Sequence, residues 1–143
     1  MKGYALDAAR RAARAPSGWF DFGGQILSWG TVREVAVADP GDRHGARLSL
    51  VLPDSASLSC SGCSERGRHL LDPRTGAPCP DWGLVAGVAG TGLDAELLST
   101  ALYVHGPEAG PALAREWGAA AAFLRHDGTV RESPAFQRLR HRP

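Results

Sequence analysis

The sequence lacks any apolar run long enough to cross a bilayer, which takes about 20 residues in a helix. It also lacks a secretory signal at its start, because residues 1–7 include a lysine and an aspartate and no apolar stretch. We therefore expect no membrane-spanning segment in this chain and, for the chain as written, a cytoplasmic location.

An excess of charge of one sign is also missing. The 16 Lys and Arg residues oppose 15 Asp and Glu residues, for a net charge of +1. A protein that wraps nucleic acid needs a clustered basic face, so we expect no nucleic-acid partner. Hydrophobic residues reach 43%, which is too many for a disordered chain. We expect residues 1–143 to form a single domain with its own core.

Cysteine is scarce, and its count of three argues against a closed disulfide framework. Cys60 and Cys63 form a Cys-x-x-Cys pair, with His69 and Cys79 nearby. Three roles are compatible with this pattern. The four residues match a zinc site, the pair alone matches a redox centre, and small residues of a loop would need no function. The third role is the commonest, and we favour it.

Local patterns predict a mixture of helices and strands. Ala-rich residues 3–14 predict a helix that ends at Pro16, and a Gly-Gly pair divides a strand region at 19–30. Thr91, followed by Asp94, predicts the start of an amphipathic helix that ends at Gly106-Pro107, with a second helix at 111–117. Further strands are expected at 32–38, 46–52, 57–61, 84–89, 119–124 and 129–131. Together they predict an α+β fold with antiparallel sheets and two to three covering helices.

Two segments suggest a ligand site. Residues 69–76, His-Leu-Leu-Asp-Pro-Arg-Thr-Gly, predict a short strand that ends in a tight turn. In the helix at 95–102, Glu96 and Thr100 are four residues apart and share a face. A carboxylate and a hydroxyl are the oxygen ligands that Mg²⁺ accepts, with Ser99 as a further candidate. Each segment alone would be an ordinary turn or polar stripe, and the pair indicates a small-molecule site with a hard metal ion.

These motifs resemble those of the ApbE-type FAD:protein FMN transferases. Residues 2–7, Lys-Gly-Tyr-Ala-Leu-Asp, are similar to a helix start of that family, and residues 23–24 and 61–62 match its Gly-Gly and Ser-Gly positions. Residues 69–76 and 95–102 are the most specific matches, in order and at the family's spacing. The resemblance implies an ApbE-like, T-fold-related C-terminal portion, and we expect the family's N-terminal portion to be absent from this chain.

The resemblance also implies an activity. Members of this family cleave FAD and attach FMN through a phosphoester to a Ser or Thr of a partner flavoprotein, using Mg²⁺. On this basis Lys2, His69 and Leu71 are expected at the flavin-nucleotide site, and Glu96 and Thr100 at the metal. The resemblance assigns no catalytic residue in this chain.

Two departures from the family bear on that activity. Glu96 stands where the family usually has Asp, and the extra methylene moves the carboxylate by roughly 1 Å, enough to slow a reaction about a hundredfold. Family chains are also much longer. The alternative to an active transferase is therefore a catalytically incomplete fragment or a flavin-binding remnant without turnover. Apolar surface that a longer chain would cover predicts self-association. Many relatives are exported, which leaves the compartment open.

Overall fold

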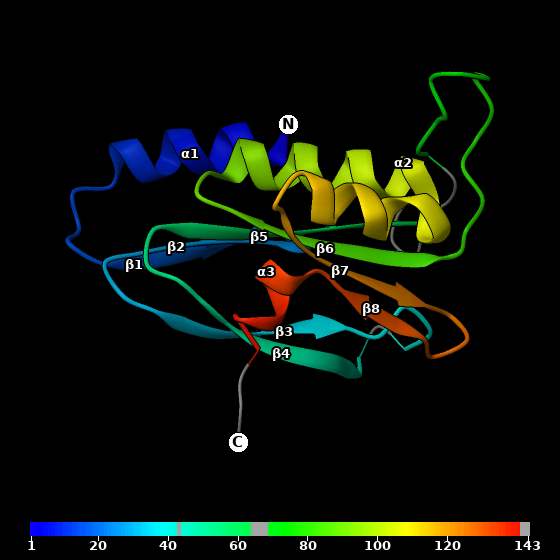
Figure 1. The fold of residues 1–143 in the computed structure, drawn as a ribbon. Coiled ribbons are helices and arrows are strands. Elements are labelled where there is room, and N and C mark those ends of the chain that lie inside the picture. Colours follow the sequence, from blue (N-terminus) through cyan, green and yellow to red (C-terminus); the bar gives the residue numbers. More distant parts are fainter. Residues whose placement is uncertain (43, 64–68, 141–143) are drawn as a thin grey trace.

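Two antiparallel sheets form the framework of the protein (Figure 1). The structure is a computed structural model, and it describes residues 1–42, 44–63 and 69–140. A six-stranded sheet has the order β1-β2-β5-β6-β7-β8, and β3 and β4 pair in a separate two-stranded sheet. The elements are, in chain order, α1 (Lys2–Ala12), β1 (Gly18–Asp21), β2 (Gln25–Trp29), β3 (Arg33–Ala38), β4 (Ala46–Leu52), β5 (Ala56–Gly62), β6 (Gly83–Ala89), α2 (Gly92–Glu116), β7 (Ala120–Arg125), β8 (Val130–Glu132) and α3 (Pro134–Gln137).

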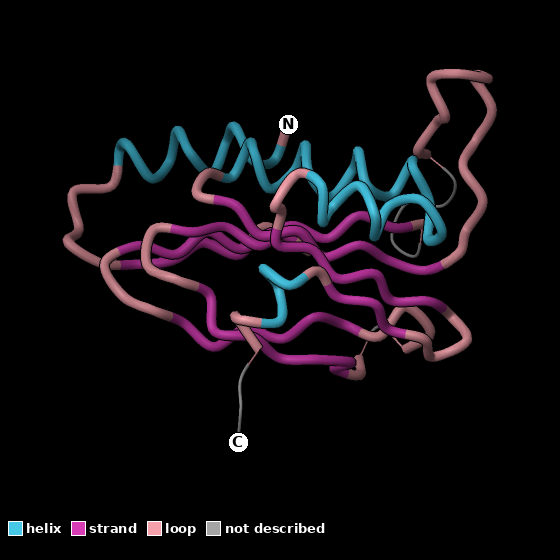
Figure 2. Tube along the Cα trace, in the orientation of Figure 1, coloured by secondary structure: helices cyan, strands magenta, loops and turns pink. Residues whose placement is uncertain are grey.

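The large sheet lies between two layers. Helices α1 and α2 cover one of its faces, while the β3–β4 ribbon and α3 lie against the other (Figures 1 and 2). The α+β class predicted from the sequence is confirmed. No helix in the described ranges has the length and apolar character needed to span a bilayer.

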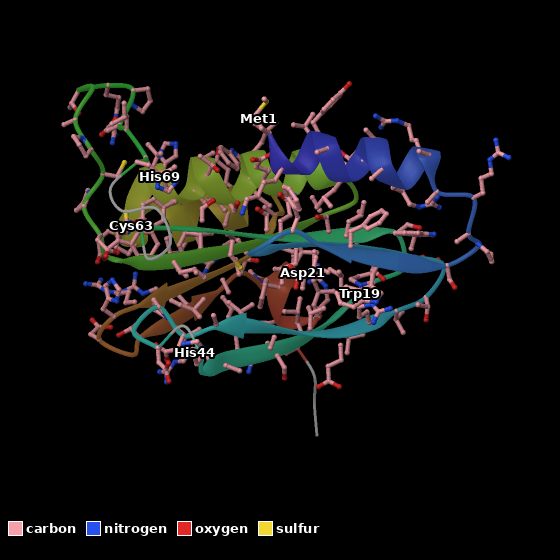
Figure 3. All side chains as sticks on the ribbon, turned by 180° about the vertical axis from the view of Figure 1, so that it is seen from behind. Met1, Trp19, Asp21, His44, Cys63 and His69 are labelled. Carbon is pink, nitrogen blue, oxygen red and sulfur yellow. The ribbon has the colours of Figure 1, made fainter. Side chains whose placement is uncertain are left out.

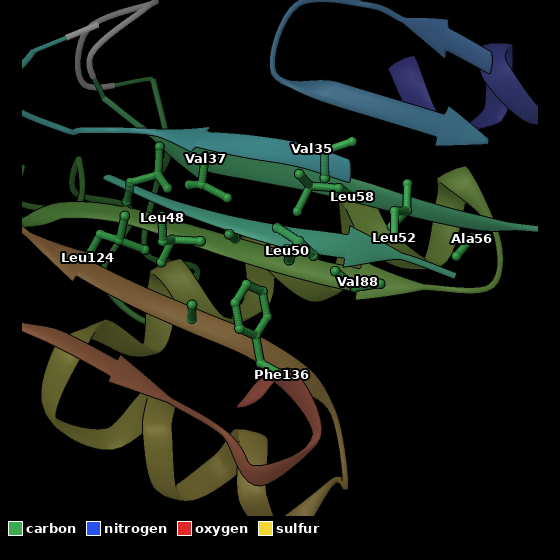
Figure 4. Packing of buried hydrophobic residues seen from close by; sticks show 13 residues of the cluster. Val35, Val37, Leu48, Leu50, Leu52, Ala56, Leu58, Val88, Leu124 and Phe136 are labelled. Carbon is green, nitrogen blue, oxygen red and sulfur yellow. The ribbon is translucent and has the colours of Figure 1, made fainter. Parts of the chain in front are cut away.

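Two apolar clusters hold these layers together. The first joins β3 and β4 to the large sheet, with Leu50, Leu58 and Phe136 among its members (Figure 4). The second joins α2 to the other face of the sheet through Leu102, Tyr103 and Phe123. Successive residues of a strand face opposite sides, so β6 and β7 contribute to both clusters and are buried on both faces. Their nearly continuous apolar sequences follow from this position.

Most predicted elements are present at nearly the predicted positions. Residues Ala46–Leu52 form β4 as expected, and the Thr91 hydroxyl accepts the Asp94 N–H at the start of α2. Gly106 has φ 82° and divides α2 at the predicted place, since this conformation favours glycine. The second helical segment begins directly after that break, several residues before the predicted start at 111. Helix α3, whose first turn is capped by Ser133, was not predicted.

The Gly-Gly pair divides the strand region at 19–30 into two strands, as predicted. The sequence was compatible with either a bulge or a close backbone approach at Gly23-Gly24. The structure has a hairpin there, in which β1 pairs with β2 and the Phe22 N–H donates to the Gln25 carbonyl. Both glycines have positive φ, 55° and 76°, and so they reverse the chain.

Helices α1 and α2 make close contact where each begins. A Cβ atom on Gly3 would lie 2.2 Å from the Gly92 carbonyl oxygen, and one on Gly92 would lie 2.6 Å from the Gly3 carbonyl oxygen. Only glycine at both positions lets the two backbones approach this closely. The contact brings the first turn of α1 next to the first turns of α2, which carry Glu96 and Thr100.

Candidate functional site

A cavity of about 670 Å³ opens where the first turns of α1 and α2 meet the end of β5. Strand β2 begins at Gln25, which pairs with Ser59, so the last residues of β5 have no β2 partner beside them. The cavity occupies this position and extends to the β3–β4 ribbon, where Ala36, Ala38 and Asp39 line it. In the view from behind, Met1 and His69 lie on the helix side of the molecule and His44 on the ribbon side (Figure 3). All three line the cavity.

The cavity unites most of the residues predicted from sequence. Lys2, His69, Glu96 and Thr100 all line it, although they come from three separate parts of the chain. The Lys2 ammonium donates to the Gly23 carbonyl, which ties the start of α1 to the glycine hairpin. The sequence thus identified a set of residues that the fold brings to one cavity.

Glu96 caps the first turn of α1. Its Oε1 accepts the terminal ammonium of Met1 at 2.7 Å and the Lys2 N–H at 3.3 Å, and its Oε2 accepts the Gly3 N–H at 2.9 Å. Partial burial opposes ionisation, but the bonds from the terminal ammonium and from Gly3 are stronger, and the pKa of Glu96 is lowered. A carboxylate offers about four acceptor positions, so Glu96 keeps one while it caps α1.

Thr100 joins a chain of hydroxyl groups that leads away from the cavity. Its Oγ1 lies 3.2 Å from Ser61 Oγ, and Ser61 Oγ lies 2.9 Å from Ser99 Oγ. Ser61 and Thr100 line the cavity, whereas Ser99 is fully buried. The expectation that Ser99 is a further metal ligand is therefore corrected, because its side chain turns toward the sheet and donates to Ser59 Oγ at 3.2 Å.

Residues 70–79 form a hairpin whose tip projects from the molecule (Figure 1). At its base, Cys79 is buried in the cluster beneath α2, and Leu70 packs against that cluster. Leu71 and Pro78 pair across it, and the Cys79 N–H donates to the Leu70 carbonyl. Leu70 lines the cavity, but Leu71 does not and is 55% exposed. Neighbouring residues of an extended segment face opposite sides, which explains the difference. The predicted contact of Leu71 with a nucleotide is thus not part of this cavity.

The turn of this hairpin is held by its own charges. Arg74 donates to both carboxylate oxygens of Asp72, at 2.9 and 2.8 Å. The bonds from the Arg74 side chain and backbone lower the pKa of Asp72 to about 2. Asp72 does not line the cavity. The structure therefore gives the Asp-Pro turn a local structural role.

The donor types at the cavity suit Mg²⁺. Glu96 and Thr100 offer a carboxylate and a hydroxyl oxygen one helical turn apart, and Mg²⁺ commonly takes one or two carboxylates and fills the rest of its shell with water and substrate phosphates. Among the described residues, no group of three or more His, Cys, Asp or Glu could hold a metal ion on its own. The residues present therefore fit a cation that shares its ligands with a bound phosphate compound.

The cysteines lie on two faces of the sheet. Cys63 and Cys79 are buried in the cluster beneath α2, where Cys63 Sγ lies 3.2 Å from the Tyr103 hydroxyl. Cys60 packs against the cluster on the ribbon side. A zinc site would need these thiols and His69 close together, and the described residues form no such cluster.

Sequence reasoning missed Gln25. This buried side chain lines the cavity, and its amide donates to the Gly92 carbonyl at 2.7 Å. Its Oε1 is buried and has no hydrogen-bond partner among the described residues. A polar residue directly after the Gly-Gly pair was the only available signal, and it is weak, because glutamine is common beside turns.

Comparison with known proteins places this arrangement in a family. Residues 1–124 match the model of the ApbE family. A FAD:protein FMN transferase of Klebsiella pneumoniae (strain 342) is 32% identical over 120 residues, which cover 74% of this chain and 34% of that protein. The FAD:protein FMN transferase of Escherichia coli (strain K12) is 30% identical over 114 residues, which cover 73% of this chain and 31% of that protein.

Solved structures of similar proteins share the fold. The ApbE protein of Thermotoga maritima MSB8 superposes with a TM-score of 0.84 at 26% identity, covering 99% of this chain and 52% of that one. The flavinyl transferase ApbE of Pseudomonas stutzeri, in its apo form, gives a TM-score of 0.77 at 28% identity, covering 99% and 49%. This chain thus spans about a third of the length of the curated relatives it matches and about half of these solved chains. By its family match and its fold, the chain belongs to the ApbE family.

Proposed function

We propose that this chain forms the flavin-nucleotide and metal site of a Mg²⁺-dependent FAD:protein FMN transferase. The observation that carries the proposal is that Lys2, His69, Glu96 and Thr100 line one and the same cavity. The relatives at about 30% identity are named FAD:protein FMN transferases, which supports the same activity here. The site would serve to hold a diphosphate beside a cation.

The proposed reaction moves a phosphoryl group. The hydroxyl oxygen of an acceptor Ser or Thr bonds to the FMN phosphorus of FAD, the bridging P–O bond of the diphosphate breaks, and AMP leaves as the hydroxyl gives up its proton. Such transfers depend mainly on positioning and on neutralising negative charge. Mg²⁺, when bound, supplies part of that neutralisation.

The chain's own residues supply the rest of the site. Glu96 and Thr100 offer oxygen ligands from one face of α2. The Lys2 ammonium places positive charge at the same cavity, which favours a phosphate group there. His69 and Leu70 close the side next to the hairpin.

A direct assay tests the proposal. The purified protein is incubated with FAD, MgCl₂ and a flavin-acceptor protein, and the intact mass of the acceptor is measured. We expect an FMN adduct whose formation is abolished by EDTA and strongly reduced by Thr100→Val. Glu116→Ala is the matched control, because Glu116 is exposed in the last turn of α2 and does not line the cavity. An adduct that forms equally well in Thr100→Val would contradict this assignment of the site.

One observation favours a second function, binding of a flavin nucleotide without turnover. Three N–H groups already occupy the Glu96 carboxylate, which leaves it fewer positions for a cation. In that case the protein would quench FAD fluorescence on binding but yield no adduct in the same assay, with or without MgCl₂. Saturable FAD binding would show that the protein has a flavin site even when no adduct forms.

A further inference from the structure

The hydrogen bonds around Ser99 have a direction that the distances alone do not show. The single proton of the Ser99 hydroxyl has two acceptors, the Glu96 backbone carbonyl and Ser59 Oγ, each 3.2 Å from Ser99 Oγ. A carbonyl oxygen only accepts, and a hydroxyl carries a single proton. The proton of Ser99 therefore points toward Ser59 and the Glu96 carbonyl, and Ser99 accepts a hydrogen bond from its remaining neighbour, Ser61.

The same reasoning fixes the next two hydroxyls. Ser61 Oγ lies 2.9 Å from Ser99 Oγ, and because Ser99 accepts there, Ser61 must donate. Ser61 Oγ also lies 3.2 Å from Thr100 Oγ1, and because the Ser61 proton is already used, Thr100 must donate. The Thr100 proton thus points at Ser61, and only its lone pairs are left for the cavity.

We propose that Ser99 is a positioning residue, which orients Ser61 and Thr100 so that Thr100 presents lone pairs alone to a divalent cation in the cavity. The inference rests on the proposed metal site and adds a residue that orients one of its ligands. A hydroxyl that can turn its proton outward repels a cation part of the time. A hydroxyl whose proton is held inward is ready to bind one.

The burial of the residues fits this role. Ser61 and Thr100 line the cavity, but Ser99 is fully buried behind them and Ser59 is nearly so. Ser99 therefore acts on a cation only through its neighbours. Groups that hold a metal ligand in place commonly contribute about tenfold or more to metal affinity.

Binding of Mn²⁺ tests the proposal without relying on turnover. Mn²⁺ accepts the same oxygen ligands as Mg²⁺, and the free ion is measured directly by electron paramagnetic resonance. MnCl₂ is titrated into the protein in the presence of FAD. We expect Ser99→Ala to raise the Mn²⁺ dissociation constant about tenfold. Ser59→Ala should have a smaller effect, because Ser99 keeps the Glu96 carbonyl as its acceptor.

Two further variants separate orientation from a general structural effect. Ser57→Ala removes an equally buried serine of β5, whose hydroxyl donates to the Ile26 carbonyl at 2.8 Å and which does not line the cavity. We expect it to leave Mn²⁺ affinity unchanged. The double variant Ser61→Ala/Ser99→Ala should lose no more affinity than the worse single variant, because both changes release the same Thr100 proton.

Each result decides the question. Wild-type Mn²⁺ affinity in Ser99→Ala, or additive losses in the double variant, would overturn the positioning role while leaving the metal site in place. A wild-type protein that binds no Mn²⁺ in the presence of FAD would overturn both the positioning role and the metal site. FAD binding, measured separately by fluorescence, shows whether the flavin site survives that outcome.

Discussion

Asp7 and Glu96 lie on different helices, and each caps the first turn of the helix that carries the other. Asp7 of α1 accepts the Gly92 and Leu93 N–H groups of α2 at 2.7 and 2.9 Å. Glu96 of α2 accepts the Gly3 N–H of α1 at 2.9 Å. Free N–H groups and the positive end of the helix dipole make each first turn a good place for a carboxylate. The exchange locks the two helices together beside the cavity.

Replacing Asp7 by alanine should destabilise the protein. The change leaves two N–H groups of α2 without their charged acceptor, and the loss of a capping side chain costs about 1–2 kcal/mol. Urea denaturation measures the free energy of unfolding. Glu116→Ala, which removes an exposed acid from the last turn of α2, is the control and should be neutral or slightly stabilising. Equal stability of the two variants would contradict the capping role.

Acid should weaken the Glu96 cap. The folded pKa of Glu96 lies below its ordinary value of 4.5, so its contribution to stability is complete above that value. The contribution is lost as the pH falls through the lower folded pKa. We expect Glu96→Gln to be less stable than wild type near neutral pH and to lose less stability between about pH 5 and pH 3. Parallel pH profiles of the unfolding free energy in the two proteins would show that Glu96 is not responsible.

Gly3→Ala should be strongly destabilising. Its Cβ would meet the Gly92 carbonyl oxygen at 2.2 Å, which forces α1 and α2 apart, and such overpacking costs about 1–3 kcal/mol or more. Gly90→Ala is the matched control, because a Cβ at Gly90 has no heavy atom within 4 Å. Thermal denaturation of both variants gives the comparison. A Gly3→Ala protein as stable as Gly90→Ala would mean that the helices do not approach as described.

The Tyr103 hydroxyl should hold the segment that follows the 70–79 hairpin against α2. It donates to the Pro80 carbonyl at 3.1 Å, and burial together with the neighbouring Cys63 thiol raises the pKa of Tyr103, so the phenol stays protonated as a donor. Tyr103→Phe should cost about 1 kcal/mol in urea denaturation, the usual net value of a buried hydrogen bond. Tyr4→Phe, at an exposed position of α1, should be neutral. A neutral Tyr103→Phe would show that this bond is dispensable.

The sequence predicted what depends on neighbours along the chain. The alternation at 46–52 gave β4, and Thr91 marked the first turn of α2. The spacing of Glu96 and Thr100 put both at one surface, which is the cavity wall. These features follow from the 3.6- and 2-residue repeats of helices and strands, which any single segment displays.

The tertiary structure decided how distant segments meet. Nothing local indicates that β2 pairs with β5, although β3 and β4 lie between them in the sequence. Nothing local indicates either that Gln25 reaches the start of α2. The relation of Ser61 to Ser99 likewise depends on the packing of α2 against β5. The periodicity of a segment shows which of its faces is buried, but it does not show which other segment covers that face.

Glu96 shows the division most clearly. From the sequence it is a carboxylate on one face of a helix, suited to a cation. Only the close approach of Gly3 to Gly92 brings the first turn of α1 within its reach, and so gives it a second task as a cap. The sequence determines that residue 96 is a carboxylate. Its partners are determined by backbone contacts between residues that lie far apart along the chain.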